Sequence, residues 1–201
     1  MSLNDELAVF DPDAGDITRY RADPTDPRGL SHARVSHVYV DSGGSAWVGT
    51  YDGHVDEFDL NTGSFSRSEL PTVGIIRGML QTRNDTLWVA DDSGLGALDL
   101  ENGSFQRYRH TPTDAYSLSD DRTLSLFEDK GGVLWVGTYK GINKWNSLVG
   151  TFDLYSHHPL DSKSLSANTV TAFSGDSLNT VWVGTYGGGV NAFNRATGEF
   201  R

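Results

Sequence analysis

The sequence predicts an all-β fold in which a unit of four short antiparallel strands recurs along the chain of 201 residues. A tryptophan-valine pair returns at intervals of 41, 47 and 47 residues, in the segments AWVGT, LWVAD, LWVGT and VWVGT. After each pair, apolar residues alternate between Gly, Asp and Asn turns, which is the pattern of strands and hairpins. Four short strands at this period match a propeller blade. We therefore expect a β-propeller segment of about four to five four-stranded antiparallel blades.

The expected elements follow one another as a single propeller segment over residues 1–201. A partial blade at 4–20 ends in GDITRY, a copy of the blade ending with no tryptophan before it. Full blades are expected at 34–68, 75–108, 122–155 and 169–201. The strands expected within the first full blade are 34–40, 45–51, 54–60 and 64–68. Gly and Asn between them supply the positive φ angles that tight hairpins require.

Charge and composition narrow the classes of function. With 27 acidic and 16 basic residues the formal net charge is −11, so the attraction behind nucleic-acid or anionic-membrane binding is missing. The absence of cysteine excludes disulfides and thiolate metal sites. No long apolar run exists, and the start lacks the features of a secretory signal. We expect a segment excised from a longer protein, with Met1, Ser2 and Leu3 left by cloning.

Repetition indicates that the tryptophans and their neighbouring glycines are structural. Bulky side chains at one place in every blade fill the space between sheets, so we expect core positions for Trp47, Trp88, Trp135 and Trp182. The Gly-Thr pairs look at first like phosphate-binding turns, but no helix follows them and no Gly-x-x-x-x-Gly-Lys motif occurs. We therefore expect structural roles also for Gly49, Gly137 and Gly184.

One blade and its copies carry a resemblance to a known family. The segment FEDKGGVLWVGTYKGINKWN (127–146), and its copies from Tyr39 and Phe173, resembles the two-component regulator propeller repeat. The connectors PTDPRGLSHARV, PTDAYSLSDDRT and PLDSKSLSANTV are similar to those of the same family. The second blade departs from the pattern, with WVADDSGLGALDL and a short connector.

The resemblance implies a periplasmic sensor propeller of a hybrid two-component or diguanylate cyclase receptor. Against the seven blades of a complete ring in that family, this segment is incomplete. The expected function is ligand sensing or interaction outside the cytoplasm, with signalling catalysis in a downstream domain and contact with the membrane only through flanking segments. Two alternatives stay open, an extracellular carbohydrate-active propeller enzyme (glycoside hydrolase or lyase) and a structural dimerisation module without ligand. The expected partners are a small polar ligand such as an oligosaccharide and a second copy of the chain, with no nucleic acid.

The long connectors and the turns after the second strands share one face of each expected blade. Aromatic rings among polar loops suit sugars, because a ring offers apolar area and the loops offer hydrogen bonds. The candidate aromatic contacts are Tyr51, Tyr139 and Tyr186. Arginines can clamp a carboxylate or a sulfate, and the candidates are Arg34, Arg77 and Arg122. Asp91 is added because it breaks the Gly-Thr pattern. The alternatives are tyrosines packed under their connectors and arginines paired with loop aspartates.

The sequence predicts no catalytic residue, cofactor or metal ion in this segment. His157 and His158 lie in a connector, with no further histidine at metal-ligand spacing. The histidines that the other blades do not repeat are His32, His37 and His54. The turns at 41–44 and 129–132 resemble the aspartate box of sialidase-like propellers only weakly, because each Asp stands six positions before its Trp, one more than in that box.

Overall fold

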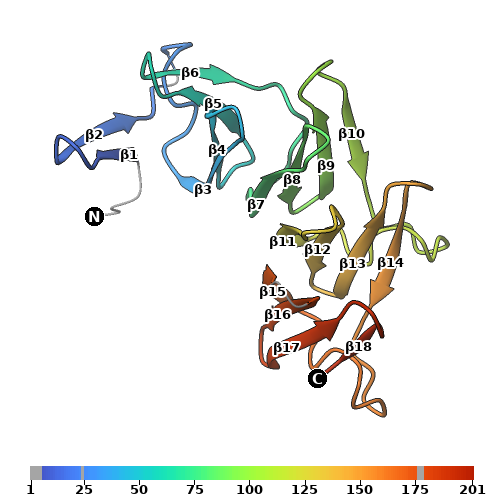
Figure 1. Cartoon of the computed structure of the whole chain (residues 1–201). Helices are drawn as coiled ribbons and strands as arrows, with labels where there is room; N and C mark the ends of the chain where they lie inside the picture. The colour runs from blue at the N-terminus through green and yellow to red at the C-terminus, as the bar shows by residue number, and fades with distance from the viewer. Residues whose placement is uncertain (1–5, 24, 176–178) are drawn as a thin grey trace. The chain divides into compact units, whose positions relative to one another are not determined.

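The fold of the chain is seen in a computed structural model that describes residues 6–23, 25–175 and 179–201 (Figure 1). The all-β prediction is confirmed, since these residues form strands, turns and loops and contain no helix. They accordingly include no helix that could cross a membrane. The expected cloning residues 1–3 and the first two residues of the expected partial blade, 4 and 5, lie outside the described part.

Five antiparallel sheets account for the strands of the described residues, and each sheet is ordered as the chain runs. The first is the hairpin of β1 (Glu6–Asp11) and β2 (Asp16–Arg21). The second contains β3 (Val35–Val40), β4 (Ala46–Thr50), β5 (Val55–Asp59) and β6 (Ser64–Arg67). The third contains β7 (Gly78–Gln81), β8 (Thr86–Asp91), β9 (Gly94–Asp99) and β10 (Phe105–Tyr108). The fourth contains β11 (Thr123–Glu128), β12 (Leu134–Thr138), β13 (Gly141–Asn146) and β14 (Thr151–Tyr155). The fifth contains β15 (Val170–Gly175), β16 (Thr180–Thr185), β17 (Gly189–Asn194) and β18 (Glu199–Phe200).

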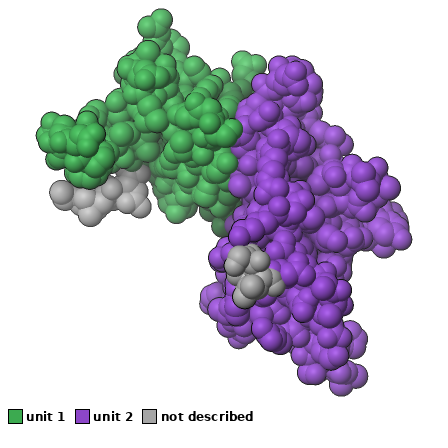
Figure 2. Space-filling model, in the orientation of Figure 1, with its two compact units in different colours: residues 1–79 green, residues 80–201 purple. Residues whose placement is uncertain are grey.

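The chain divides into two compact units, residues 1–79 and residues 80–201 (Figure 2). The sequence predicts one segment, and the division falls within β7. A tyrosine lies at or one residue before the end of the last strand in three sheets, at Tyr20, Tyr108 and Tyr155. Ser68 occupies the corresponding position after β6. The second sheet therefore lacks the tyrosine that, in three other sheets, ends or nearly ends the last strand.

Each of these tyrosines packs against two aromatic rings of the sheet that follows it in the chain. In the first unit, Tyr20 meets the edges of Phe58 and Phe65, with ring centroids 4.7 and 5.8 Å away. In the second unit, Tyr108 meets Trp145 and Phe152, and Tyr155 meets Phe193 and Phe200 in the same way. Such pairs contribute about 0.5–1.5 kcal/mol each beyond the area that they bury. Aromatic triads thus hold successive sheets together inside each unit.

The expected core role of the tryptophans holds for three of them and not for the fourth. Trp47, Trp88 and Trp135 are buried, and Trp135 is only 1% exposed beneath residues of β16–β18. Trp182 is 41% exposed. A tryptophan of one sheet in the second unit is covered by the sheet that follows it, and no described sheet follows β15–β18. Trp182 has the same position in its repeat, but no sheet of the described residues packs over it.

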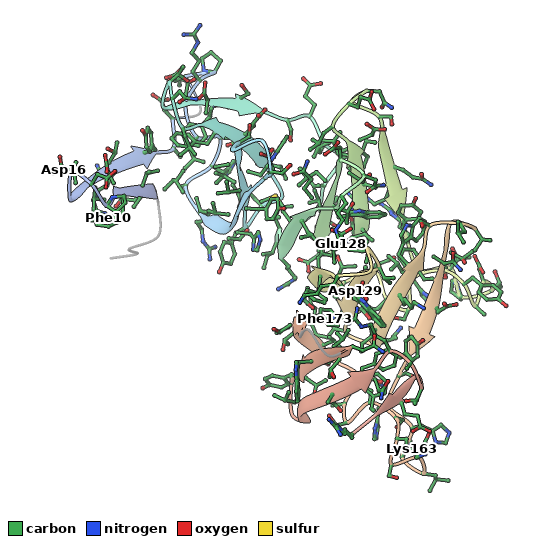
Figure 3. The ribbon with its side chains drawn as sticks, in the orientation of Figure 1. Phe10, Asp16, Glu128, Asp129, Lys163 and Phe173 are labelled. Atoms are coloured by element: carbon green, nitrogen blue, oxygen red, sulfur yellow. The ribbon has the colours of Figure 1, made fainter. Side chains whose placement is uncertain are left out.

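Polar clamps hold the buried indole rings in place. The carboxylate of Asp41 accepts a hydrogen bond from the indole N–H of Trp47, and that of Asp129 accepts one from Trp135. The donor–acceptor distance is 3.0 Å in both bonds. Each carboxylate also accepts backbone N–H groups of its own turn. Asp129, in the turn after β11 (Figure 3), is buried and also pairs with Arg195, 3.1 Å away. The weak likeness of these turns to an aspartate box therefore reflects a structural hydrogen-bond pattern.

The expected structural role of the glycines has a steric basis at two positions. A Cβ on Gly137 would come within 2.8 Å of Val170 Cγ1 and of the Val170 carbonyl oxygen, at the start of β15. A Cβ on Gly49 would meet Ile76 Cγ2 at 2.5 Å. At Gly184 the nearest atom, Ala172 Cβ, is 3.4 Å away, which is ordinary van der Waals contact. The glycine is therefore required where another part of the chain packs closely against the second strand.

Candidate functional site

The candidate site is a repeated junction between a connector and the turn that follows the second strand of a sheet. In the first unit, the N–H of Tyr51 donates to the carbonyl of Arg34 over 2.9 Å. In the last sheet, the N–H of Tyr186 donates to the carbonyl of Thr169 over the same distance. This backbone hydrogen bond brings the end of the connector beside the turn. Side chains that are about seventeen residues apart in the sequence therefore lie together.

At two of these junctions an arginine stacks on the tyrosine. Arg34 Cζ lies 4.3 Å from the centre of the Tyr51 ring, and Arg122 Cζ lies 4.1 Å from the centre of the Tyr139 ring. Cation–π contacts at exposed positions contribute about 0.5–1 kcal/mol. Each pair therefore places a guanidinium group over a tyrosine ring. The first pair belongs to unit 1 and the second to unit 2.

Arg122 also belongs to a small charged network. Its Nε lies 3.3 Å from Asp120 Oδ1, and Lys140 Nζ lies 3.3 Å from Asp120 Oδ2. Burial raises the pKa of Asp120, but hydrogen bonds from the Arg122 backbone and from the Lys140 and Arg122 side chains outweigh it and leave this pKa below its usual value. The expectation that arginines pair with loop aspartates applies here, whereas no carboxylate pairs with Arg34 in the described ranges.

The other expected ligand contacts lie in different environments. Tyr186 is 80% exposed and has Thr169 where the two junctions above have an arginine. Arg77, just before β7, is half-buried. Asp91, which we chose because it breaks the Gly-Thr pattern, lies in the interior. Its carboxylate pairs with Arg107 at 2.8 Å and accepts the N–H and hydroxyl of Ser93, so it stabilises its own sheet.

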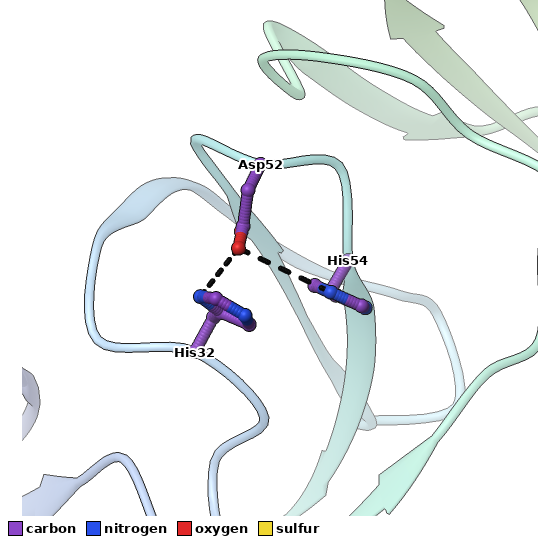
Figure 4. A group of neighbouring side chains, drawn as sticks. All are labelled: His32, Asp52 and His54. Carbon is purple, nitrogen blue, oxygen red and sulfur yellow. Dashed lines mark ion pairs between the residues drawn. The ribbon is translucent and has the colours of Figure 1, made fainter. Parts of the chain in front are cut away.

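The junction of the second sheet also holds a cluster that the sequence did not reveal. His32, Asp52 and His54 lie together, and the same carboxylate oxygen of Asp52 faces a nitrogen atom of each imidazole ring (Figure 4). His32 belongs to the connector, and the other two residues belong to the turn between β4 and β5. Only the packing of connector against turn brings them together. The signal available in the sequence was that both histidines depart from the other repeats at this junction.

The fold and the repeated junctions define the chain as a partial β-propeller. Residues 117–140 and 164–187 match the model of the family described as two component regulator propeller. The chain thus carries two-component regulator propeller repeats, as the resemblance implied. Each match runs from the connector through the second strand to the turn, and the first includes Arg122 and Tyr139.

Several solved structures have a similar fold. The extracellular domain of the putative hybrid two component system BT4673 from B. thetaiotaomicron is 18% identical, with a TM-score of 0.78, and the match covers 99% of this chain and 25% of that one. The corresponding domain of BT3049 from the same organism is 20% identical, with a TM-score of 0.64 and coverages of 96% and 31%. PorZ, a surface component of the type-IX secretion system of Porphyromonas gingivalis, is 17% identical, with a TM-score of 0.77 and coverages of 99% and 31%.

The chain therefore spans about a quarter to a third of the length of these solved chains. Because these sequence identities are only 17–20%, the structural similarity shows that the fold is shared and nothing more. Comparison with curated proteins gives no match.

Proposed function

We propose that the chain is part of the ligand-sensing or interaction propeller of a bacterial membrane signalling receptor, of the two-component or diguanylate cyclase type. The observation that carries the proposal is the match of two repeats to the two-component regulator propeller family. The fold shared with extracellular domains of two putative hybrid two component systems supports the same function and a location outside the cytoplasm. Ligand binding must favour one receptor state over another for a signal to result.

The ligand that fits the junctions best is a small polar molecule with an acidic group, such as an oligosaccharide that bears a carboxylate or a sulfate. The pairs Arg34–Tyr51 and Arg122–Tyr139 each offer an aromatic ring and a planar guanidinium group. The Nε–H of Arg122 is bonded to Asp120, so its terminal N–H groups are the donors offered to a ligand there. Such donors match the two oxygens of a carboxylate or a sulfate. A ring beside them suits the apolar face of a sugar.

We propose further that this segment is not a catalyst. A glycoside hydrolase needs a carboxylic acid whose pKa is raised, so that it can protonate the leaving group. Among the described carboxyl groups whose pKa is clearly shifted, such as Asp120 and Asp129, every shift is downward. This direction is the opposite of the one that a general acid requires.

The test is a calorimetric titration of the chain with oligosaccharides of equal length that are neutral, contain uronic acids or are sulfated. We expect an acidic oligosaccharide to bind and Arg122→Ala or Tyr139→Ala to weaken its binding at least about tenfold. Lys163→Ala is the control, since Lys163 pairs with Glu199 on the surface of the last sheet. Equal binding by the Arg122 variant and the wild type would contradict the assignment of the ligand to this junction. Cleavage of an oligosaccharide would favour the carbohydrate-active enzyme instead.

A further inference from the structure

The strongest unassigned feature of the chain is the cluster of His32, Asp52 and His54 in unit 1 (Figure 4). Nδ1 of His32 contacts Oδ2 of Asp52 directly, and Nε2 of His54 lies 4.0 Å from the same oxygen. One ligand-type atom from each residue lies within 4.8 Å of the other two. The two imidazole rings stack, with centroids 4.7 Å apart and planes 11° apart. Two nitrogen atoms and one carboxylate oxygen thus lie within one small volume.

We propose that these three side chains bind a divalent transition-metal ion such as Zn²⁺. Two imidazoles and a carboxylate are a common protein ligand set for zinc, and imidazole also suits copper and nickel. Calcium and magnesium prefer oxygen ligands, of which the cluster supplies a single carboxylate. Bonds of about 2.0–2.2 Å in a tetrahedral arrangement separate ligand atoms by about 3.4 Å. The side chains are 49%, 40% and 52% exposed, so they can rotate by the small amount that this spacing requires.

The Asp52 carboxylate is oriented by a buried residue. The Thr50 hydroxyl donates to Asp52 Oδ1 over 2.6 Å, and the same oxygen atom of Thr50 accepts the N–H of His54 over 2.9 Å. Thr50 itself is fully buried at the end of β4. One carboxylate oxygen is therefore occupied by the protein, and the other is directed at the two histidines. Partners that hold a ligand in this way are typical of metal sites.

The connector side of the cluster is anchored in a similar manner. The N–H of Ser31, next to His32, donates to Asp56 Oδ2 over 2.7 Å inside the sheet. In the fourth and fifth sheets the same bond is accepted by the amides of Asn143 and Asn191. Asp56 replaces that amide with a carboxyl group, and its buried Oδ1 has no hydrogen-bond partner among the described residues. The bond from Ser31 to Asp56 fixes the connector residue next to His32 to β5, the strand that follows His54.

Comparison of the repeats shows that the fold does not require these three side chains. At the corresponding junction the fourth sheet has Asp120, Lys140 and Gly141, and the fifth has Ala167, Gly187 and Gly189. Asp120 and Lys140 form an ion pair there. The junction thus brings connector and turn side chains into contact in more than one sheet, and one sheet places metal-binding residues in it. Replacing them by the small residues of the fifth sheet is compatible with the fold.

The test is a calorimetric titration of the metal-free chain with ZnCl₂. We expect one zinc ion per chain, binding at least about tenfold weaker in His32→Ala, Asp52→Asn and His54→Ala, and no binding in the double variant His32→Ala/His54→Ala. His158→Ala is the matched control, because it removes an exposed connector histidine that lies outside the cluster. Co²⁺ in place of zinc should give the visible absorption of a four-coordinate ion in the wild type and not in the double variant.

Thermal unfolding without metal establishes that each variant is folded, as the residues of the fifth sheet lead us to expect. Failure of the wild type to bind zinc, or wild-type affinity in the folded double variant, would overturn the proposal. An equal loss of affinity in His158→Ala would place the ion elsewhere and would overturn it too. Neither result bears on oligosaccharide binding at Arg122 and Tyr139, so this inference and the proposed function can fail separately.

Discussion

At the scale of single residues, repetition separates what the backbone requires from what is specific to one sheet. Gly49, Gly137 and Gly184 occupy one place in three sheets. The first two face atoms that leave no room for a Cβ, and the third does not. Sequence alone cannot make this distinction, because the letters are the same. The distinction depends on whether another part of the chain packs against the glycine.

Gly137→Ala and Gly184→Ala form a matched pair for testing the packing between sheets. We expect Gly137→Ala to lower the free energy of unfolding by about 1–3 kcal/mol, because the added methyl group overpacks against Ser125 Oγ and against the side chain and carbonyl of Val170. Gly184→Ala should change it by less than about 0.5 kcal/mol. Denaturant unfolding of both variants measures the difference. Equal effects would contradict the close approach of β15 to Gly137.

The residues chosen as ligand contacts show where reasoning from sequence succeeds and where it stops. The tyrosines and the arginines before them were found because they repeat at fixed distances from the tryptophans, and Arg34 and Arg122 do lie on Tyr51 and Tyr139. Asp91 was chosen because it breaks the repeat, but its partner Arg107 lies in another strand of the same sheet. The pairing of strands decides such a contact, and the pattern of one segment does not contain it.

At the scale of elements, the turn after the first strand of the fourth sheet is held by the carboxylate of Asp129. Burial raises the pKa of Asp129, but hydrogen bonds from Trp135 and from two backbone amides, together with the charge of Arg195, lower it to a net value below the ordinary one. A carboxyl group with a lowered pKa in the folded state stabilises that state above its unfolded pKa of about 3.9. This contribution is lost as the pH falls through the lower, folded pKa.

Asp129→Asn tests this contribution. At pH 7 we expect the variant to be less stable than the wild type by about 2 kcal/mol, because charge-assisted hydrogen bonds to Trp135 and the turn are weakened. The difference should shrink as the pH falls below about 4, since the wild-type carboxylate then becomes protonated. Asp153→Asn, on the exposed side of β14, serves as the control. A difference that stays constant from pH 7 to pH 3 would contradict this account.

The elements also explain why the fold class could be predicted and the histidine cluster could not. Glycine turns and alternating apolar residues act over four to seven positions, so each hairpin is visible in its own segment. The cluster joins His32 to a turn twenty residues further along the chain. Its formation depends on how the connector packs, which no local pattern records.

At the scale of the whole molecule, Trp182 exposes a large apolar side chain on the last sheet. A large apolar side chain on a sheet face is usually covered, because burying apolar area contributes about 25 cal/mol per Å². We propose that a second copy of the chain covers this face. Light scattering behind a sizing column should then give about twice the chain mass of 21.9 kDa.

Trp182→Glu should shift that mass toward the monomer. Leu148→Glu changes an exposed apolar residue in a different sheet, in the turn between β13 and β14, and should leave the mass unchanged. A wild-type chain that stays monomeric at all concentrations tested would contradict the proposal of a homo-oligomer.

The uneven exposure of the tryptophans also gives the chain an optical property. Trp182 is the most exposed of five indole rings, and Trp47, Trp88 and Trp135 are shielded inside their sheets. An indole in water emits at longer wavelength than one in an apolar interior, and a soluble quencher reaches it more readily. The red edge of the emission spectrum therefore belongs mainly to Trp182. A partner that covers Trp182 will therefore shift the emission of this residue to shorter wavelength, so binding can be followed without a dye attached to the chain.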